Sequence, residues 1–237
     1  MKYFVLPALI ASLLLIMPPV ARAAASTGQM NLIRNAAAAF EQMPAMVPRC
    51  VLNNARGIVV VPNALKSRLL FGGGQQLGVL VTRLPDKSWS APSFVTFSGA
   101  KVVDELYGVG VRNVILILNT PRAVADAEAG TLYPGAGIPI TAGPIGADRC
   151  DSCTVPAVYS YVSSACTIFR ATVKASLLAI DHCANWSVYG MANPLRMPGM
   201  KALGAARNFD CTVARATGAP VKVCGWAHRG RTLGEGA

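Results

Sequence analysis

The sequence predicts a single α+β domain built on a mostly antiparallel β-sheet or barrel-like core with a few short helices. Short apolar segments rich in β-branched residues are separated by Gly and Pro, and helical spacing is confined to a few stretches. Apolar residues make up 53% of the chain and charged residues only 14%. This composition favours a tightly packed core over a solvated surface that binds nucleic acid.

The first 23 residues have the character of a secretory signal peptide. Lys2 precedes an apolar run over residues 4–17, and Ala21-Arg22-Ala23 places small residues where a signal peptidase reads them. A membrane anchor is the alternative, but the run is short for crossing about 30 Å of hydrocarbon. We expect cleavage after Ala23, which lowers the formal net charge from +11 to +9. The mature protein is then periplasmic or secreted, or peripheral to a membrane.

The first expected helix covers residues 28–43, where apolar residues recur on one face. A helix lying on a membrane surface is the alternative, but the segment has a single cation and little bulk, so a core-packing helix is favoured. A turn is expected at residues 85–87. Strands are expected around it, at 57–61, 69–71, 77–83 and 93–97.

The second half of the chain also consists of short expected strands and helices. Residues 114–118 are continuously apolar, as in a strand buried on both faces. A short helix over 121–129 should begin with Thr120 as its N-cap and Pro121 in its first turn. Residues 193–237 form a basic extension rich in Ala, Gly and Pro. Strands are expected at 138–141, 155–162 and 168–180, followed by a turn or short helix at 181–189.

Residues 55–99 resemble the opening half of a SYLF domain. The resemblance rests on Ala55-Arg56-Gly57, Pro62, Lys66, Gly72-Gly73, Gly78-Val79-Leu80 and Trp89-Ser90-Ala91-Pro92. It continues in Ala142-Gly143-Pro144-Ile145-Gly146, in Tyr161, and in the segment from Asp181 through Ala184-Asn185 to Tyr189-Gly190. It implies a SYLF domain over residues 24–192. The expected structural positions are Gly57, Trp89, Pro92, Gly143, Pro144, Tyr161 and Asn185.

The resemblance also implies lipid or phosphoinositide binding, with actin binding in some eukaryotic members. An exported protein does not meet the actin of its own cell, so we expect an anionic phospholipid or membrane surface as the partner. A structural or protein-interaction role in the cell envelope is the alternative, with a protein of the envelope as partner. Neither reading involves nucleic acid.

Two candidate lipid-binding places follow from the residues. Lys66 and Arg68 precede a glycine turn that includes Gly72 and Gly73, whose N–H groups would cradle a phosphate. A solvated hairpin with ordinary surface charges is the alternative. The second place is one face of the expected strand at 168–180, where the chain departs from the family's glycine pattern. That face would carry Arg170 and Lys174.

Several other residues invite a chemical role. Trp89 is interpreted as an aromatic that caps the core, with a membrane-interface anchor as the alternative. The odd count of seven cysteines leaves at least one unpaired, and we expect disulfides between Cys211 and Cys224 and within Cys150-Asp151-Ser152-Cys153. A redox-active Cys150-x-x-Cys153 is disfavoured because no helix follows it.

We expect no enzymatic activity and no cofactor or metal. Only two histidines are present, and the chain has neither a phosphate-loop glycine signature nor a compact set of zinc ligands.

Overall fold

The computed structural model describes eleven segments of the chain. These are residues 19–43, 45–64, 75–98, 101–103, 113–132, 140–146, 155–164, 167–170, 172–174, 177–202 and 204–220. The helices are α1 (Pro19–Glu41), α2 (Arg49–Asn54), α3 (Pro121–Glu128), α4 (His182–Tyr189) and α5 (Ala205–Ala216), with 3₁₀ turns η2 (Pro194–Arg196) and η3 (Gly199–Lys201). The strands are β1 (Gly57–Val61), β2 (Gln75–Thr82), β3 (Ser93–Ser98), β4 (Lys101–Val103), β5 (Asn113–Leu118), β6 (Ile140–Ala142), β7 (Val158–Ser164), β8 (Thr167–Arg170), β9 (Thr172–Lys174) and β10 (Leu177–Ile180).

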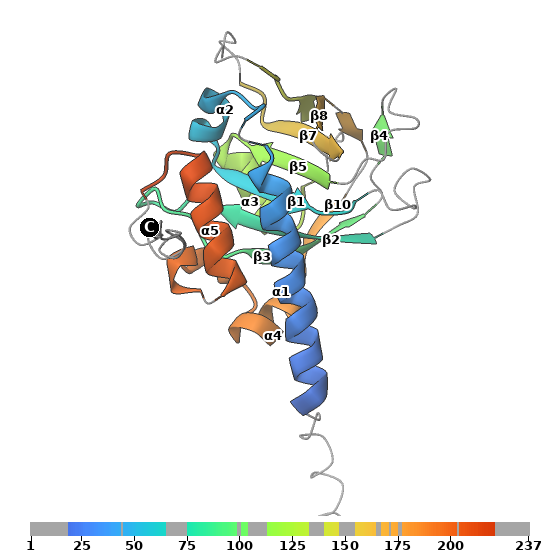
Figure 1. Ribbon diagram of the computed structural model, residues 1–237, viewed down its shortest axis with the longest axis vertical. Coiled ribbons are helices and arrows are strands. Elements are labelled where there is room, and N and C mark those ends of the chain that lie inside the picture. Colours follow the sequence, from blue (N-terminus) through green and yellow to red (C-terminus); the bar gives the residue numbers. More distant parts are fainter. Residues whose placement is uncertain are drawn as a thin grey trace, which may run out of the picture.

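A curled sheet forms the centre of the molecule (Figure 1). Its strand order is β10-β3-β2-β1-β5-β7-β6, with β8 paired to β7. All of its ladders are antiparallel except that between β6 and β7, which is parallel. A separate two-stranded ladder joins β4 to β9. The predicted single α+β domain with a mostly antiparallel sheet is confirmed.

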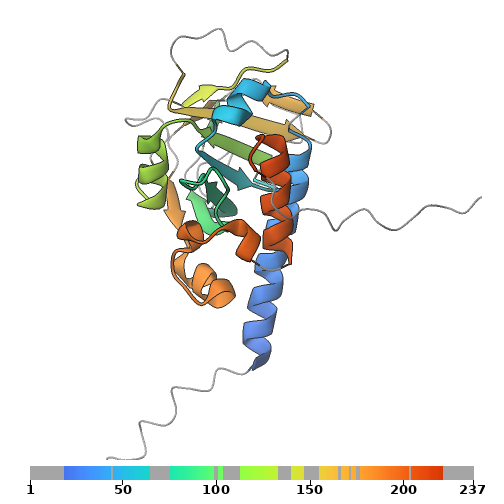
Figure 2. The same cartoon turned by 90° about the vertical axis from the view of Figure 1, so that its left-hand side faces the viewer.

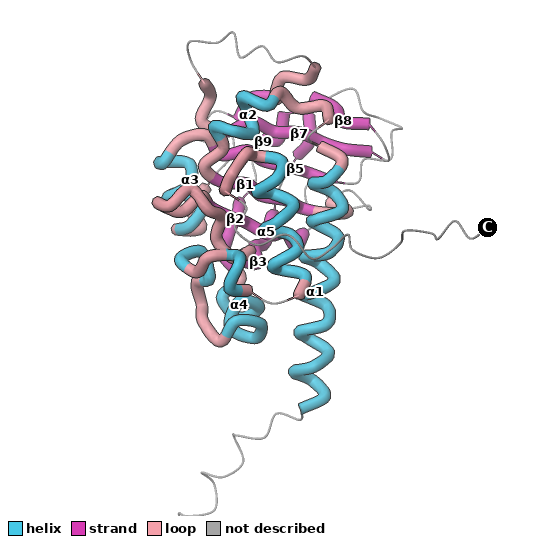
Figure 3. The backbone as a smooth tube through the Cα atoms, turned by 60° about the vertical axis from the view of Figure 1, so that its left-hand side comes forward, coloured by secondary structure: helices cyan, strands magenta, loops and turns pink. Residues whose placement is uncertain are grey.

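The central strands β1 and β5 are buried on both faces. In β1, Ile58 and Val60 face one apolar cluster, while Val59 and Val61 face a second. The first cluster includes side chains of α1, α2 and α5, and the second those of α3. Figures 1 and 3 show α1 and α5 on one side of the strands and α3 on the other. Residues 114–118 in β5 are likewise buried and divide between the two clusters, so the predicted strand buried on both faces is confirmed.

Helix α5 lies beside α1 and completes the first cluster. The rings of Phe40 and Phe209 meet edge to face with their centroids 6.5 Å apart. The packed structure thus continues past residue 192, where the sequence interpretation placed the start of a basic extension. The apolar face of α5 consists largely of small alanines, which hid its helical spacing. The buried residues of α5 are Ala205, Ala206, Phe209, Asp210, Cys211, Val213 and Ala214.

The N-terminal part of α1 projects beyond the sheet (Figures 1 and 2). Its buried described side chains begin at Ile33. The cleavage expected after Ala23 falls inside this helix but before that packing face. No helix in the described part of the chain is both long and apolar enough to cross a membrane.

Helix α3 begins as its sequence predicts. The Thr120 side chain accepts a hydrogen bond from the Ala123 N–H at 3.2 Å, and Pro121 occupies the first turn. Ala123 and Ala127 are buried against the second cluster. Gly130 follows the helix with a positive φ of 69°, a conformation that glycine adopts without steric cost.

Asn185 fastens α4 to β3. Its Oδ1 accepts from the Phe94 N–H at 2.8 Å, and its Nδ2 donates to Ser93 Oγ at 2.9 Å and to the Ala192 carbonyl at 3.1 Å. The residue is fully buried. A neighbouring bond, from the Tyr189 hydroxyl to the Pro92 carbonyl at 2.8 Å, links α4 to the residue that precedes β3.

Gly143 and Gly57 lie where a side chain would collide. A Cβ on Gly143 would lie within 2.5 Å of ring atoms of Tyr161, whose hydroxyl donates to the Pro144 carbonyl at 3.3 Å. A Cβ on Gly57 would come within 2.9 Å of Leu118. These glycines are required by close packing rather than by an unusual backbone conformation.

The segment 168–180 is not the single strand that its sequence predicts. It forms β8, β9 and β10, which pair with β7, β4 and β3 respectively. Arg170 therefore lies opposite Tyr161, whereas Lys174 lies opposite Lys101 in another ladder. The two cations do not share one strand face, because three different partners divide the segment.

Asp210 is a buried carboxyl on α5. It is 3% exposed, and its Oδ1 has no hydrogen-bond partner within the described residues. Its side chain fills the space beside Gly199, where a Cβ would come within 2.6 Å of the Asp210 Cγ. Burial raises the pKa of Asp210 to about 6.

Asn185→Ala should destabilise the domain by about 2 to 3 kcal/mol, because it removes three hydrogen bonds and leaves buried groups of β3 unpaired. Urea unfolding checks this value. Asn31→Ala, at an exposed position on α1, should change the free energy of unfolding by about 0.5 kcal/mol or less. Equal losses in the two variants would contradict the assigned role.

Asp210→Asn should stabilise the protein above pH 6. The pKa of Asp210 in the folded protein lies above its ordinary 3.8, so the wild type loses stability as pH rises through this window. The asparagine variant avoids that loss. Urea unfolding should show an advantage of the variant that is on the order of 2 kcal/mol larger at about pH 8 than at about pH 4. A pH-independent difference would refute the assignment.

Candidate functional site: a basic pocket

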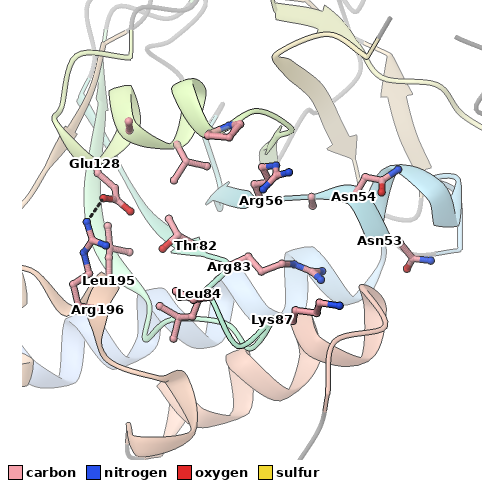
Figure 4. A pocket seen from close by; sticks show the side chains of 15 residues that line it. Asn53, Asn54, Arg56, Thr82, Arg83, Leu84, Lys87, Glu128, Leu195 and Arg196 are labelled. Carbon is pink, nitrogen blue, oxygen red and sulfur yellow. Dashed lines mark hydrogen bonds and ion pairs between the residues drawn. The ribbon is translucent and has the colours of Figure 1, made fainter. Parts of the chain in front are cut away.

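A pocket of about 720 Å³ opens where the first ladder of the sheet leaves the core. Its walls come from the end of α2, the entry to β1, the turn after β2, one face of α3, and η2 (Figure 4). Its size lies within the range of small-molecule sites. The lining residues are Asn53, Asn54, Ala55, Arg56, Thr82, Arg83, Leu84, Pro85, Lys87, Pro121, Val124, Ala125, Glu128, Leu195 and Arg196.

Arg56 and Arg83 are neighbours across the β1–β2 ladder. Gly57 pairs with Thr82, and one step further out the Arg83 N–H donates to the Arg56 carbonyl at 2.7 Å. Like charges placed opposite each other on adjacent strands are unfavourable. The sheet register therefore brings two guanidinium groups to one place at an electrostatic cost.

Arg83 is the half-buried member of the pair. Its guanidinium carbon lies 4.9 Å from the centre of the Trp89 ring, and its Nη2 donates to the Thr217 carbonyl at 3.3 Å. Its Nε is buried and has no acceptor within the described residues. Burial, and then the charge of Arg56, lower the pKa of Arg83. An anion in the pocket would relieve both effects.

The buried Trp89 ring packs against the Arg83 guanidinium. The indole is 1% exposed, and its Nε1 donates to Thr217 Oγ1 at 2.9 Å. This position confirms the core-capping interpretation of Trp89 over a membrane-interface anchor. The C-terminal end of α5 thus holds both the indole and the guanidinium of the pocket floor.

Lys87 adds a third cation from the turn between β2 and β3. It has a positive φ of 66°, and its N–H donates to the Leu84 carbonyl at 2.9 Å. The nearby Asp86 carboxylate accepts from the N–H and the hydroxyl of Ser88. The turn predicted at residues 85–87 is confirmed, and it presents an exposed ammonium group at the rim of the pocket.

The opposite side of the pocket is electrically compensated. Glu128 on α3 pairs with Arg196 at 3.4 Å. Within the described residues, Arg56, Arg83 and Lys87 form no ion pair. The pocket therefore has one uncompensated cationic side and one neutral side.

The candidate lipid site at Lys66, Arg68, Gly72 and Gly73 lies outside the described residues and stays a prediction. The lipid-binding roles of Arg170 and Lys174 also stay predictions, although these two residues belong to different ladders. The pocket cations were not chosen from the sequence. The sequence does place Arg56 and Arg83 at the ends of two expected strands. It does not give the register between those strands, which brings the two residues opposite each other.

Three of the seven cysteines lie in the described part of the chain. Cys50 and Cys211 are each disulfide-bonded, and Cys183 is a free, exposed thiol. Cys150, Cys153 and Cys224 lie outside the described residues, so both expected pairings stay predictions. Within the described residues, no group of three or more His, Cys, Asp or Glu side chains is placed to hold a metal ion.

A family model described as "Ysc84: Las17-binding protein actin regulator" matches residues 105–197. Protein YSC84 of Saccharomyces cerevisiae is 34% identical over 151 residues, which cover 61% of this chain and 32% of that protein. The human SH3 domain-containing YSC84-like protein 1 is 34% identical over 102 residues, or 43% of this chain and 29% of that protein. These matches confirm the predicted resemblance to the SYLF family.

The chain spans about a third of the length of these curated relatives. The segment matched by the family model supplies the α3 and η2 walls of the pocket. The three uncompensated cations precede that segment. The family-model match therefore does not extend to the cationic side of the pocket.

Arg56→Gln should raise stability at low ionic strength, because it removes the repulsion on Arg83, and the gain should shrink as salt screens that repulsion. Unfolding midpoints measured across a salt series check this expectation. Arg34→Gln, at an exposed position on α1, serves as the control and should show no such salt-dependent gain. A gain independent of salt would argue against charge repulsion in the pocket.

Proposed function

We propose that this SYLF-domain protein is exported and binds anionic membrane surfaces through the basic pocket. The observation that carries the proposal is the cluster of Arg56, Arg83 and Lys87, which lack an ion-pair partner within the described residues. The half-buried Arg83 is held in this unfavourable position by Trp89 and Thr217. A fold that maintains such a charge cluster is suited to meet an anion.

The net charge supports the same proposal. After the expected cleavage the protein would carry a formal charge of +9, so long-range attraction would bring it to an anionic surface before the pocket engages. Anionic headgroups also supply the oxygen acceptors that guanidinium groups require. The resemblance to lipid-binding SYLF domains favours a lipid over another polyanion.

Export is the second part of the proposal. It is supported by Lys2, the apolar run 4–17 and Ala21-Arg22-Ala23. The disulfide-bonded Cys50 and Cys211 fit an oxidising compartment. We propose the periplasm or the cell exterior as the location, with the protein peripheral to the membrane.

A second candidate function is protein interaction in the envelope. It is favoured by Trp186 on α4, which is 59% exposed, and by Met191, which follows α4 and is 37% exposed. Large exposed apolar side chains of this kind are enriched in interfaces. The names of related yeast proteins, which describe binding to Las17, also point to a protein partner for those relatives.

Sedimentation with vesicles tests the membrane proposal. The protein should bind phosphatidylglycerol vesicles and not phosphatidylcholine vesicles, and binding should weaken as salt rises. Arg56→Glu with Lys87→Glu should weaken binding about tenfold or more, since it reverses two charges at the pocket. Arg34→Glu with Lys201→Glu, which changes the net charge equally at exposed positions away from the pocket, should retain most of the binding.

Equal losses in the two double variants would show that net charge, not the pocket, drives binding. A loss seen only in Lys66→Glu with Arg68→Glu would place the site at the hairpin expected from the sequence. Absence of binding to any vesicle at low salt would refute the membrane proposal. Trp186→Ala should leave vesicle binding unchanged if α4 serves a protein partner instead.

A further inference from the structure

The pocket has a cationic side that is uncompensated within the described residues, and apolar side chains form part of its lining. Figure 4 shows the charged ends of Arg83 and Lys87 on the side where Asn53 and Asn54 lie, and the Glu128–Arg196 pair on the opposite side. The lining also includes the apolar side chains of Leu84, Val124 and Leu195. A flat membrane surface needs only exposed charge, whereas this arrangement provides a cavity for part of one molecule.

The charged side offers donors and excess positive charge. Arg83 Nε lacks an acceptor within the described residues. Arg56, whose carbonyl accepts from the Arg83 N–H, lies close enough for its charge to lower the pKa of Arg83. Guanidinium groups match the oxygens of phosphate and carboxylate groups through paired N–H donors. Lys87 and the two asparagine side chains add further donors at the same side.

The number of cations favours a dianion. The one lining carboxylate, that of Glu128, is engaged by Arg196, so three cations face the pocket uncompensated within the described residues. A phosphate monoester carries a charge of about −1.5 to −2 at neutral pH and presents three terminal oxygens. A phosphodiester or sulfate ester carries a single charge and would leave more of this repulsion unrelieved.

We propose that the pocket binds one phosphate monoester group, with Arg83 and Arg56 holding its oxygens, Lys87 closing the rim, and Leu84, Val124 and Leu195 contacting the apolar part of the ligand. This inference rests on the proposed function and sharpens it from a charged surface to a single headgroup. The same chemistry occurs in a lipid with a terminal phosphate and in a soluble phosphate ester.

Trp89 provides a direct readout, because its ring carries the Arg83 guanidinium at 4.9 Å. The chain has three tryptophans, so Trp186→Phe with Trp226→Phe isolates the emission of Trp89. In this background, hexyl phosphate should shift the Trp89 emission and bind about tenfold or more tightly than hexyl sulfate, which has the same chain and one charge less. It should also bind more tightly than inorganic phosphate, because the apolar wall contacts its chain.

Arg83→Lys keeps the charge but removes the paired donors. It should weaken hexyl phosphate binding about tenfold and change binding to phosphatidylglycerol vesicles by about twofold or less. Lys87→Met, at an exposed position, gives an independent loss of hexyl phosphate binding should Arg83→Lys fail to fold. Lys201→Met, outside the pocket, is the matched control and should bind as the wild type does.

The outcomes separate this inference from the membrane proposal. Tighter binding to vesicles containing phosphatidic acid than to phosphatidylglycerol vesicles of equal charge, with competition by hexyl phosphate, supports both. Equal binding to the two vesicles without competition overturns the phosphate site and leaves membrane binding standing. Binding of hexyl phosphate without binding to any vesicle supports the phosphate site on a soluble ester and overturns the membrane proposal. Equal affinity for hexyl sulfate and hexyl phosphate overturns the proposed preference for a doubly charged phosphate monoester.

Discussion

The burial of β1 and β5 on both faces is the constraint on which the rest of this structure depends. Their side chains alternate between two apolar clusters, so the sheet is stable only when both faces are covered. Helices α1 and α5 cover one face, while α3 contributes to the other. Helix α5, near the C-terminal end of the described structure, returns to lie beside α1 and so completes this cover.

The basic pocket arises where this constraint ends. Beyond Gly57 and Thr82 the β1–β2 ladder passes out of the apolar layers, and its next residues are Arg56 and Arg83. The residues that follow α5 reach the same place, where Thr217 contacts both Arg83 and Trp89. Helix α5 and its C-cap residue Thr217 thus pack against the core and also position the half-buried Arg83. The basic pocket is therefore a consequence of how the β1–β2 ladder ends.

Local sequence signals identified much of the fold. Thr120 and Pro121 marked the start of α3 because a cap and a first-turn proline act within a few residues of each other. The apolar run at 114–118 marked a strand buried on both sides. By contrast, the division of residues 168–180 into three strands depends on three separate pairing partners, and no local pattern records them. The same is true of α5, whose alanine-rich face acquires meaning only against Phe40 and its neighbours.

The sequence by itself determined the fold class, the family resemblance, the short-range caps and turns, and the positive charge of the chain. These properties depend on residues close together in the chain or on composition. The tertiary structure alone decided that Arg56, Arg83 and Lys87 share one pocket and that Trp89 lies beneath it. Strand register and the return of α5 set those distances, and both result from packing between segments that are far apart in the sequence.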